Sequence, residues 1–314
     1  MKILITELLD QAVYKVFQYK YPDLDFRVDI DFPKKNIKEQ ANILKNCDGL
    51  IIRSQTKITK ELVMKAKNLK IIVSACTGMD NVDLETLKQL EIKHINLPNG
   101  NYEAVAEHII CLIFALAKNL VPANQQLKNL IWCKNEYISE MVSGKTLGII
   151  GFGKIGKSLS KKALGLGLKI LAHDPFVDLT KYSQVKPAAL DTLLKKSDYI
   201  AVCVPLLKET TNLINENKLG LMKPSAYLIN CSRGEVIDEK ALYYCCKNRK
   251  ISGAGLDVFV NEPNINYNLC RLKNIIATPH IAGQTKKALK KNSESALKQV
   301  INYLLSLQYE QSIC

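Results

Sequence analysis

The feature that most constrains the fold of this chain is the glycine-rich turn Gly-Phe-Gly-Lys-Ile-Gly at residues 151–156. A short apolar run at 146–150 precedes the turn, and residues 154–165 have the apolar spacing of a helix. In a strand–turn–helix unit of this kind the first glycine permits a tight turn, and the second lets the backbone approach a pyrophosphate. The third lets the helix and the strand pack closely, and the helix N-terminus attracts the anion. We therefore predict that a dinucleotide binds at Gly151, Gly153, Lys154, Ile155 and Gly156.

An acidic residue in the right place narrows the choice of dinucleotide. Asp174 lies 18 residues after Gly156 (174 − 156), at the end of a predicted strand at 168–172. A carboxylate there accepts hydrogen bonds from the ribose hydroxyls of NAD and repels the additional phosphate of NADP. Because Pro175 follows, Asp174 could instead serve only to form an Asp-Pro turn. The complete order of strand, turn, helix, strand and acid favours NAD as the cofactor.

The rest of the chain alternates strand and helix patterns in two blocks. A chain of 314 residues exceeds what one hydrophobic core usually serves, so we expect two domains. In the first block we predict strands at 2–6, 26–30, 49–53, 70–74 and 93–96, with helices at 11–19, 38–46, 60–67 and 84–90. In the second block, after helices at 103–120 and 124–132, we predict strands at 146–150, 168–172, 199–204, 226–230, 253–259 and 275–278. Such alternation predicts parallel sheets covered by helices on both faces.

The last predicted helix, at 284–305, has no strand after it. We expect it to pack on the first block, which would make that domain discontinuous. The predicted fold class is therefore α/β with two parallel-sheet lobes, a Rossmann NAD-binding domain being inserted in a flavodoxin-like substrate domain. We place the NAD-binding domain at 98–284 and the substrate domain at 1–97 and 285–314.

Composition excludes several other classes of protein. The formal net charge is +14, but the lysines are spread along the chain without a dense basic block, so we do not expect nucleic acid as a partner. The ten cysteines include no C-x-x-C pair, and no H-E-x-x-H or Cys/His cluster predicts a metal. The N-terminus reads as a strand rather than a signal peptide, and the most apolar run, 109–117, is too short to cross a bilayer. We therefore expect a cytoplasmic protein that does not bind a membrane.

Three polar side chains follow predicted strands of the second block. Arg233 comes after strand 226–230, Glu262 after strand 253–259, and His280 after strand 275–278. In an open parallel sheet such strand ends can converge on one ligand. A histidine can take a hydroxyl proton or return it to a carbonyl, a neighbouring carboxylate stabilises its imidazolium form, and an arginine can hold a substrate carboxylate by two hydrogen bonds. This set predicts hydride transfer at a carbon that bears oxygen. We interpret His94, His108 and His173 as surface or packing residues.

At these motifs the chain resembles the D-isomer-specific 2-hydroxyacid dehydrogenase family over nearly its whole length. The resemblance rests on the glycine turn with Asp174, on the segments 230–238 and 255–259 with Glu262-Pro263, and on Thr278-Pro279-His280. The Arg-to-Glu and Glu-to-His separations of 29 and 18 (262 − 233 and 280 − 262) also fit that family. It implies that Arg233 orients a 2-oxo acid, that His280 is the acid/base and that Glu262 pairs with His280. Further cofactor contacts that it implies are Thr77, Pro205, Cys231, Ser232, Asp257 and Gly283. The family also implies a homodimer through the cofactor domain, with helices near 103–132 in the interface.

Within the family, residues 52–59, 77–83, 96–101 and 105–108 resemble the D-3-phosphoglycerate dehydrogenases. This likeness implies oxidation of 3-phospho-D-glycerate in serine biosynthesis, in a short form without the C-terminal regulatory module. The substrate contacts it implies are Arg53, Ser54, Cys76, Thr77, Gly78 and Lys134, together with Arg233 and His280. Ser74, Lys134 and Cys203 depart from residues that are frequent at these positions in such enzymes. A glyoxylate or hydroxypyruvate reductase, a D-lactate-type dehydrogenase and an NAD-sensing corepressor remain alternatives.

Overall fold

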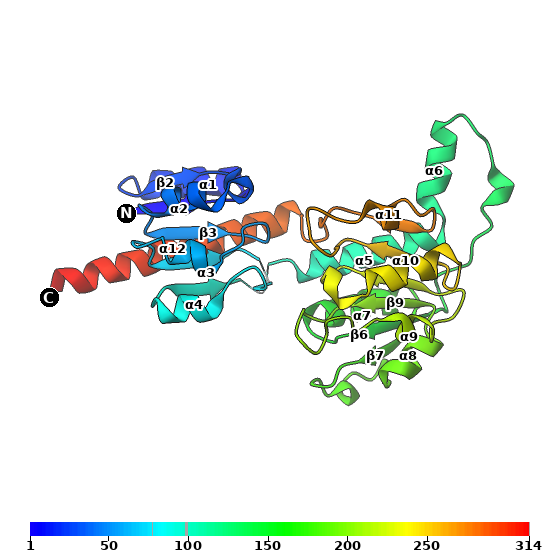
Figure 1. The fold of residues 1–314 in the computed structure, drawn as a ribbon. Helices are drawn as coiled ribbons and strands as arrows, with labels where there is room; N and C mark the ends of the chain where they lie inside the picture. The colour runs from blue at the N-terminus through cyan, green and yellow to red at the C-terminus, as the bar shows by residue number, and fades with distance from the viewer. Residues whose placement is uncertain (77, 98–99, 314) are drawn as a thin grey trace. The chain divides into compact units, whose positions relative to one another are not determined.

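The computed structural model describes residues 1–76, 78–97 and 100–313. The chain forms two compact units, Met1–Asn101 with Gln284–Cys314 and Tyr102–Gly283, and each is described by itself (Figure 1). Both units consist of one parallel sheet with helices, so the predicted α/β fold class with two parallel-sheet lobes is confirmed.

The first unit contains a five-stranded sheet in the order β2-β1-β3-β4-β5. Its strands are β1 (Lys2–Ile5), β2 (Asp25–Val28), β3 (Gly49–Ile52), β4 (Ile71–Ser74) and β5 (Lys93–Asn96). This is the flavodoxin-like order, with the switch between β1 and β3. The central strands are apolar because both of their faces are covered, whereas β2 at the edge is largely exposed.

The helices of the first unit begin at polar caps. They are α1 (Gln11–Lys20), α2 (Ile37–Leu44), α3 (Lys60–Val63), α4 (Leu84–Gln89) and α12 (Lys286–Ile313). Asp10, Asn36, Thr59 and Asp83 each accept a backbone N–H in the first turn of the helix that follows, which satisfies a donor that the helix itself leaves open. The predicted helix at 60–67 ends earlier, at Val63.

Helix α12 covers one face of this sheet. Its buried side chains, among them Leu297, Val300 and Leu304, pack in one cluster with residues of β1, β3 and β4. A side chain at Gly49 would come within 2.7 Å of Val300, so the strand needs glycine there for α12 to lie this close. The C-terminal helix therefore completes the core of the N-terminal sheet.

The second unit contains a seven-stranded parallel sheet in the order β12-β11-β10-β9-β6-β7-β8. Its strands are β6 (Thr146–Ile150), β7 (Lys169–His173), β8 (Val185–Pro187), β9 (Tyr199–Val202), β10 (Tyr227–Asn230), β11 (Gly253–Leu256) and β12 (Ile275–Ala277). Its helices are α5 (Tyr102–Ala117), α6 (Leu120–Lys128), α7 (Lys154–Gly165), α8 (Leu190–Lys196), α9 (Glu216–Leu219), α10 (Glu239–Lys247) and α11 (Tyr267–Cys270). The order from β8 to β12 is that of a Rossmann sheet with one added strand, and its switch point lies between β6 and β9.

Some elements of this unit differ from the prediction. Strand β8 was not expected, since it has three residues, ends at Pro187 and buries only Val185. Helix α6 starts at Leu120, earlier than predicted, and is bent by 63° from α5. Together with the segment that follows, it extends away from the body of its unit (Figure 1). Among the described residues no single helix is long and apolar enough to cross a membrane, and only the bent pair α5 and α6 has the length and composition to do so.

Candidate active site

The three glycines of the turn after β6 each meet a different steric demand. Gly151 has φ +93°, and a Cβ on it would lie 2.8 Å from the backbone of Cys203. A Cβ on Gly156 would lie 2.4 Å from the carbonyl oxygen of Gly151, so α7 can pack on the turn only with glycine at this position. A Cβ on Gly153, in contrast, would meet nothing within 4 Å. The backbone at Gly153 is therefore open to a ligand at the N-terminus of α7.

Asp174 follows β7 and turns its carboxylate to the glycine turn. Its Oδ2 accepts the N–H of Phe152 at 2.7 Å, and its Oδ1 accepts those of Phe176 at 2.9 Å and Val177 at 3.1 Å. Asp174 thus forms the Asp-Pro turn that the sequence offered as an alternative role. It also connects the turn after β7 to the glycine turn by its bond to Phe152. It remains half-buried at the rim of a cavity of about 370 Å³, whose lining includes His173, Val177 and Pro187.

These features fit a dinucleotide. The open Gly153 and the N-terminus of α7 offer N–H donors to a pyrophosphate, and the cavity beside Asp174 offers space and a carboxylate to an adenosine. Lys154 is exposed at the first position of α7, and Ile155 packs against the core behind it. Among the described residues no three His, Cys, Asp or Glu side chains are grouped as a metal site requires.

Arg233 lies in the loop after β10. This loop lies close to the loop after β11, with Gly234 at the point of contact. Asn230 holds this loop, because its amide nitrogen donates to the carbonyl of Arg233 at 2.8 Å and its amide oxygen accepts from Ser232. A Cβ on Gly234 would lie 2.1 Å from the carbonyl carbon of Phe259. Only glycine therefore lets the backbone next to Arg233 approach the backbone that leads to Glu262.

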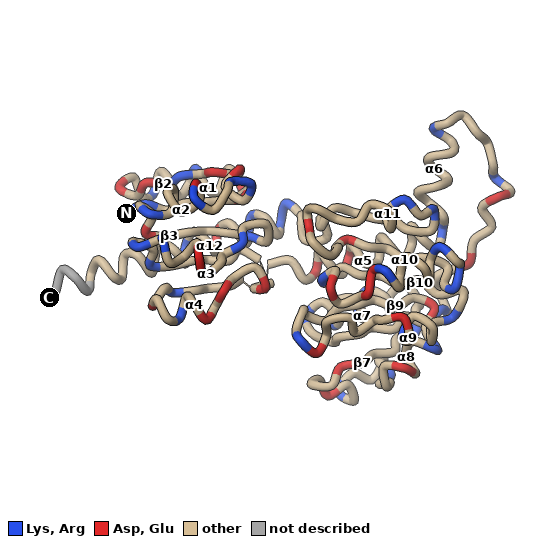
Figure 2. The backbone as a smooth tube through the Cα atoms, viewed as in Figure 1, with Lys and Arg blue, Asp and Glu red and all other residues tan. Residues whose placement is uncertain are grey.

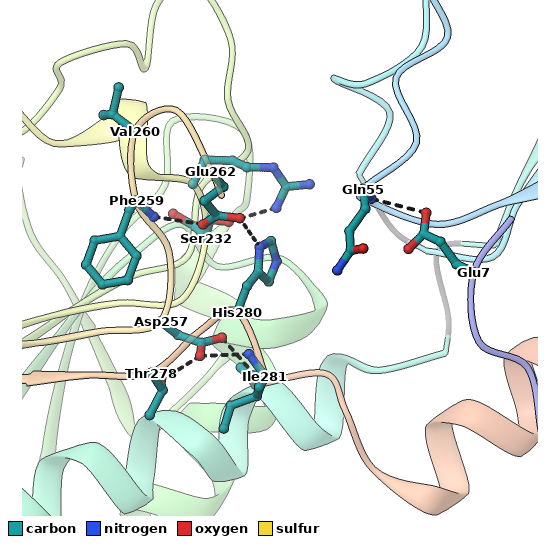
Figure 3. A network of polar contacts seen from close by, with 12 residues as sticks. Glu7, Gln55, Ser232, Asp257, Phe259, Val260, Glu262, Thr278, His280 and Ile281 are labelled. Atoms are coloured by element: carbon teal, nitrogen blue, oxygen red, sulfur yellow. Dashed lines mark hydrogen bonds and ion pairs between the residues drawn. The ribbon is translucent and has the colours of Figure 1, made fainter. Parts of the chain in front are cut away.

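Glu262 and His280 form a hydrogen-bonded pair (Figure 3). His280 Nδ1 lies 2.6 Å from Glu262 Oε2, while Glu262 Oε1 accepts the N–H of Phe259 at 2.8 Å. Burial alone would raise the pKa of Glu262. The hydrogen bond and charge of His280, the N–H of Phe259 and the charge of Arg233 outweigh burial and hold this pKa below its usual value.

A carboxylate that stays ionised can only accept hydrogen bonds, so His280 Nδ1 carries the proton in this pair. His280 Nε2 bonds to none of the described residues and is the nitrogen left for a substrate. His280 has φ +54°, in the left-handed region that non-glycine residues rarely adopt. Backbone strain of this kind is common at functional sites.

A buried carboxylate holds the segment that carries His280. Asp257 is fully buried and accepts the hydroxyl of Thr278 at 2.6 Å and the N–H groups of Ile281 and Ala282 at 2.8 Å each (Figure 3). His108 on α5 lies 3.1 Å from Thr278 Oγ1 and 3.6 Å from Asp257 Oδ1. His108 therefore packs beside the segment that carries His280, a contact of which the sequence around it on α5 gives no signal.

The other predicted cofactor contacts of this unit lie around the same strand ends. Cys231 and Ser232 are buried directly after β10, Pro205 follows β9, and Gly283 ends the unit after Ala282. Burial raises the pKa of the Cys203 thiol to about 12, and burial together with the charge of Asp257 raises that of Cys231 well above its usual value. Lys134 lies elsewhere, in the exposed segment after α6.

The predicted substrate residues of the first unit follow its strands β3 and β4. Arg53 and Ser54 come directly after β3, and Cys76 and Gly78 come after β4. Arg53 Nε is buried without a hydrogen-bond partner among the described residues, and its Nη1 lies 3.3 Å from Gln284 Oε1. Thr77 falls outside the described residues.

Comparison with known proteins agrees with this arrangement. Residues 110–282 match the model of the NAD binding domain of the D-isomer specific 2-hydroxyacid dehydrogenases, which confirms NAD as the predicted cofactor. The chain is 34% identical over 314 residues to a D-3-phosphoglycerate dehydrogenase of Synechocystis sp., covering 99% of the chain and 56% of that relative. It thus spans little more than half the length of that protein.

Two further similarities concern relatives of about the length of this chain. A hydroxypyruvate reductase of Thermotoga maritima is 39% identical over 269 residues, covering 85% of the chain and 88% of that relative. The solved structure of a D-lactate dehydrogenase from Aquifex aeolicus, complexed with NAD and lactic acid, is similar with a TM-score of 0.85 and 31% identity, covering 99% of this chain and 97% of that one.

Proposed function

The chain belongs to the family of D-isomer-specific 2-hydroxyacid dehydrogenases, and on that premise we propose that it interconverts a 2-hydroxy acid and its 2-oxo acid with NAD. The observation that carries the proposal is the 2.6 Å contact between His280 Nδ1 and Glu262 Oε2, in the same unit as the glycine turn. A histidine whose Nδ1 is held by an ionised carboxylate is oriented to exchange a proton through Nε2.

Each polar residue then has a distinct task. NAD, when bound at the glycine turn, supplies the carbon that accepts or returns the hydride. His280 Nε2 takes the proton of the substrate hydroxyl in oxidation and returns it to the carbonyl oxygen in reduction. Glu262 remains ionised and stabilises the imidazolium that forms. The Arg233 guanidinium binds the substrate carboxylate and keeps the reacting carbon in place.

As the substrate we propose 3-phospho-D-glycerate, which would give 3-phosphohydroxypyruvate in the direction of serine biosynthesis. The support is the likeness of the first unit to phosphoglycerate dehydrogenases and the buried Arg53 Nε, which has no partner among the described residues. A guanidinium with an open donor suits a phosphate or carboxylate oxygen. The alternative is a hydroxypyruvate or glyoxylate reductase, which the 39% identity to the Thermotoga maritima enzyme supports.

A substrate panel tests both levels of the proposal. NADH oxidation is followed at 340 nm with phosphohydroxypyruvate, hydroxypyruvate, glyoxylate and pyruvate at matched concentrations. We expect the highest kcat/KM with phosphohydroxypyruvate. Equal or faster turnover of an unphosphorylated acid would refute the phosphoglycerate assignment, and no turnover of any 2-oxo acid would refute the dehydrogenase assignment.

We also propose that the chain acts as a homodimer through the NAD-binding unit. The segment that includes α6 and extends away from that unit carries apolar side chains that are almost fully exposed, with 94% for Leu130, 81% for Trp132 and 91% for Ile138. Apolar surface of this kind is usually covered by a partner. Light scattering after size-exclusion chromatography should give twice the chain mass of 35.2 kDa, and a monomer at micromolar concentration would contradict the proposal.

A further inference from the structure

The loop after β3, at residues 53–56, is held by a single carboxylate oxygen. Glu7 Oε1 accepts the backbone N–H of Arg53 at 2.8 Å, of Gln55 at 3.1 Å and of Thr56 at 3.2 Å. It also accepts the hydroxyl of Thr56 at 3.2 Å. Figure 3 shows the contact between Glu7 and Gln55. Glu7 follows the neighbouring strand β1, so the contact joins segments that are 46–49 residues apart in sequence.

A second side chain holds the carbonyl groups of the same loop. Asn81 Nδ2 donates to the carbonyl oxygen of Arg53 at 2.8 Å and to that of Thr56 at 2.7 Å. At the end of the loop, the hydroxyl of Thr56 lies 2.7 Å from that of Thr6, and both residues are fully buried. Glu7 therefore binds the N–H donors of the loop, and Asn81 binds the carbonyl acceptors of its first and last residues.

These contacts decide which donors of the loop are open to a ligand. The amides of Arg53, Gln55 and Thr56 are used by Glu7. Among the described residues, the amide of Ser54 donates to no acceptor, and Arg53 Nε has no partner. The Ser54 amide and the Arg53 guanidinium thus form the donor set that the loop can offer to an anion.

We propose that Glu7 and Asn81 are positioning residues that set the affinity for the substrate anion by fixing the loop of Arg53 and Ser54. The inference rests on the proposed function, since it takes this loop as a substrate-binding loop. Neither side chain touches the substrate. They act because a loop of four residues, without these bonds, would lose the partners of three amides and two carbonyls and would populate many conformations. Binding would then have to order the loop, which weakens the affinity.

The test compares the Michaelis constant for the best 2-oxo acid of the panel with kcat and with the dissociation constant of NADH, in the full chain. Glu7→Ala should raise KM about tenfold or more, with kcat changed less, because misplaced binding groups are costly. The dissociation constant of NADH, from fluorescence titration, should stay unchanged. Glu7→Gln should restore KM to within about threefold of the parent, since an amide oxygen accepts the same N–H bonds. Glu61→Ala, which removes an exposed acid paired with Lys65 in the same unit, is the matched control and should leave every constant unchanged.

Two further variants keep the outcomes distinct. Arg53→Ala should raise KM, and Glu7→Ala should raise it no further in that background, because Glu7 acts through the loop. If Arg53→Ala leaves KM unchanged, the substrate loop of the proposed function is wrong. If Arg53→Ala raises KM while Glu7→Ala does not, or if the two effects multiply, the positioning role is wrong.

Should Glu7→Ala fail to fold, Asn81→Asp decides instead. It sets a carboxylate against two carbonyls and should raise KM, and an unchanged KM would overturn the inference.

Discussion

The substitution Gly234→Ala tests how the loops of Arg233 and Glu262 are held together. The added Cβ would lie 2.1 Å from the carbonyl carbon of Phe259, 2.3 Å from the nitrogen of Val260 and 2.5 Å from the oxygen of Phe259. All three atoms belong to the backbone, so no side-chain rotation relieves the overlap. Ordinary van der Waals contact begins at 3.4 Å, and one loop must therefore move by about 1.3 Å. Overpacking of this kind costs about 1–3 kcal/mol of stability.

The functional effect should be larger than the effect on stability. A displacement of about 1 Å in a substrate-positioning group can lower the rate about 100-fold, so we expect kcat/KM for the 2-oxo acid to fall by about that factor. NADH binding, measured by fluorescence titration, should change much less, because the glycine turn follows β6, which β9 separates from β10.

Gly165→Ala is the matched control for this variant. A Cβ there would meet nothing within 4 Å, so stability and kcat/KM should equal those of the parent or stability should rise slightly. If Gly234→Ala kept kcat/KM within about twofold of the parent, the argument that close approach of these loops positions the catalytic groups would be refuted.

Three further predictions follow from charge and burial. The pKa of Glu262 is lowered in the folded protein, so its contribution to stability is present at neutral pH and is lost as the pH falls through that pKa. The difference in unfolding free energy between the parent and Glu262→Gln should therefore narrow below about pH 4, and urea titrations that show a constant or widening difference would contradict this. Asp174→Ser removes the carboxylate that faces the cavity beside the glycine turn. The ratio of kcat/KM with NADH to kcat/KM with NADPH should fall by about tenfold or more. An unchanged ratio would exclude a role of Asp174 in the choice of cofactor. The thiols of Cys203 and Cys231 should resist iodoacetamide at pH 8 in the folded chain, since burial keeps them protonated, and rapid labelling of either in peptide mass spectra would show the opposite.

Much of the fold was predictable because local signals agreed with the final packing. The five strands of the first unit lie within two residues of their predicted ends, since apolar runs such as 49–52 can be buried on both faces of a parallel sheet. The glycine turn was equally clear, because the order of strand, glycines and helix is local, although the contact of Gly151 with the backbone of Cys203 was not visible in it. Strand β8 had no such signal, as its pairing with β7 decides its conformation.

The side-chain contacts of the site were less accessible from the sequence. Arg233, Glu262 and His280 follow strands and could be singled out, but nothing local indicates that Gly234 must meet the backbone of Phe259. His108 and Glu7 show the same limit. Each contacts its partners across 46 residues or more, and such pairings depend on sheet order, which a single sequence does not specify.

Single-turnover oxidation of bound NADH tests the central claim most directly, namely that His280, held by Glu262, exchanges the proton that accompanies hydride transfer. Chain preloaded with NADH is mixed with the best 2-oxo acid in a stopped-flow instrument, and the parent is compared with His280→Ala. We predict rapid loss of NADH absorbance in the parent and a rate at least about 100-fold lower in the variant, with NADH binding retained. A variant that oxidises bound NADH at the parent rate would contradict the account.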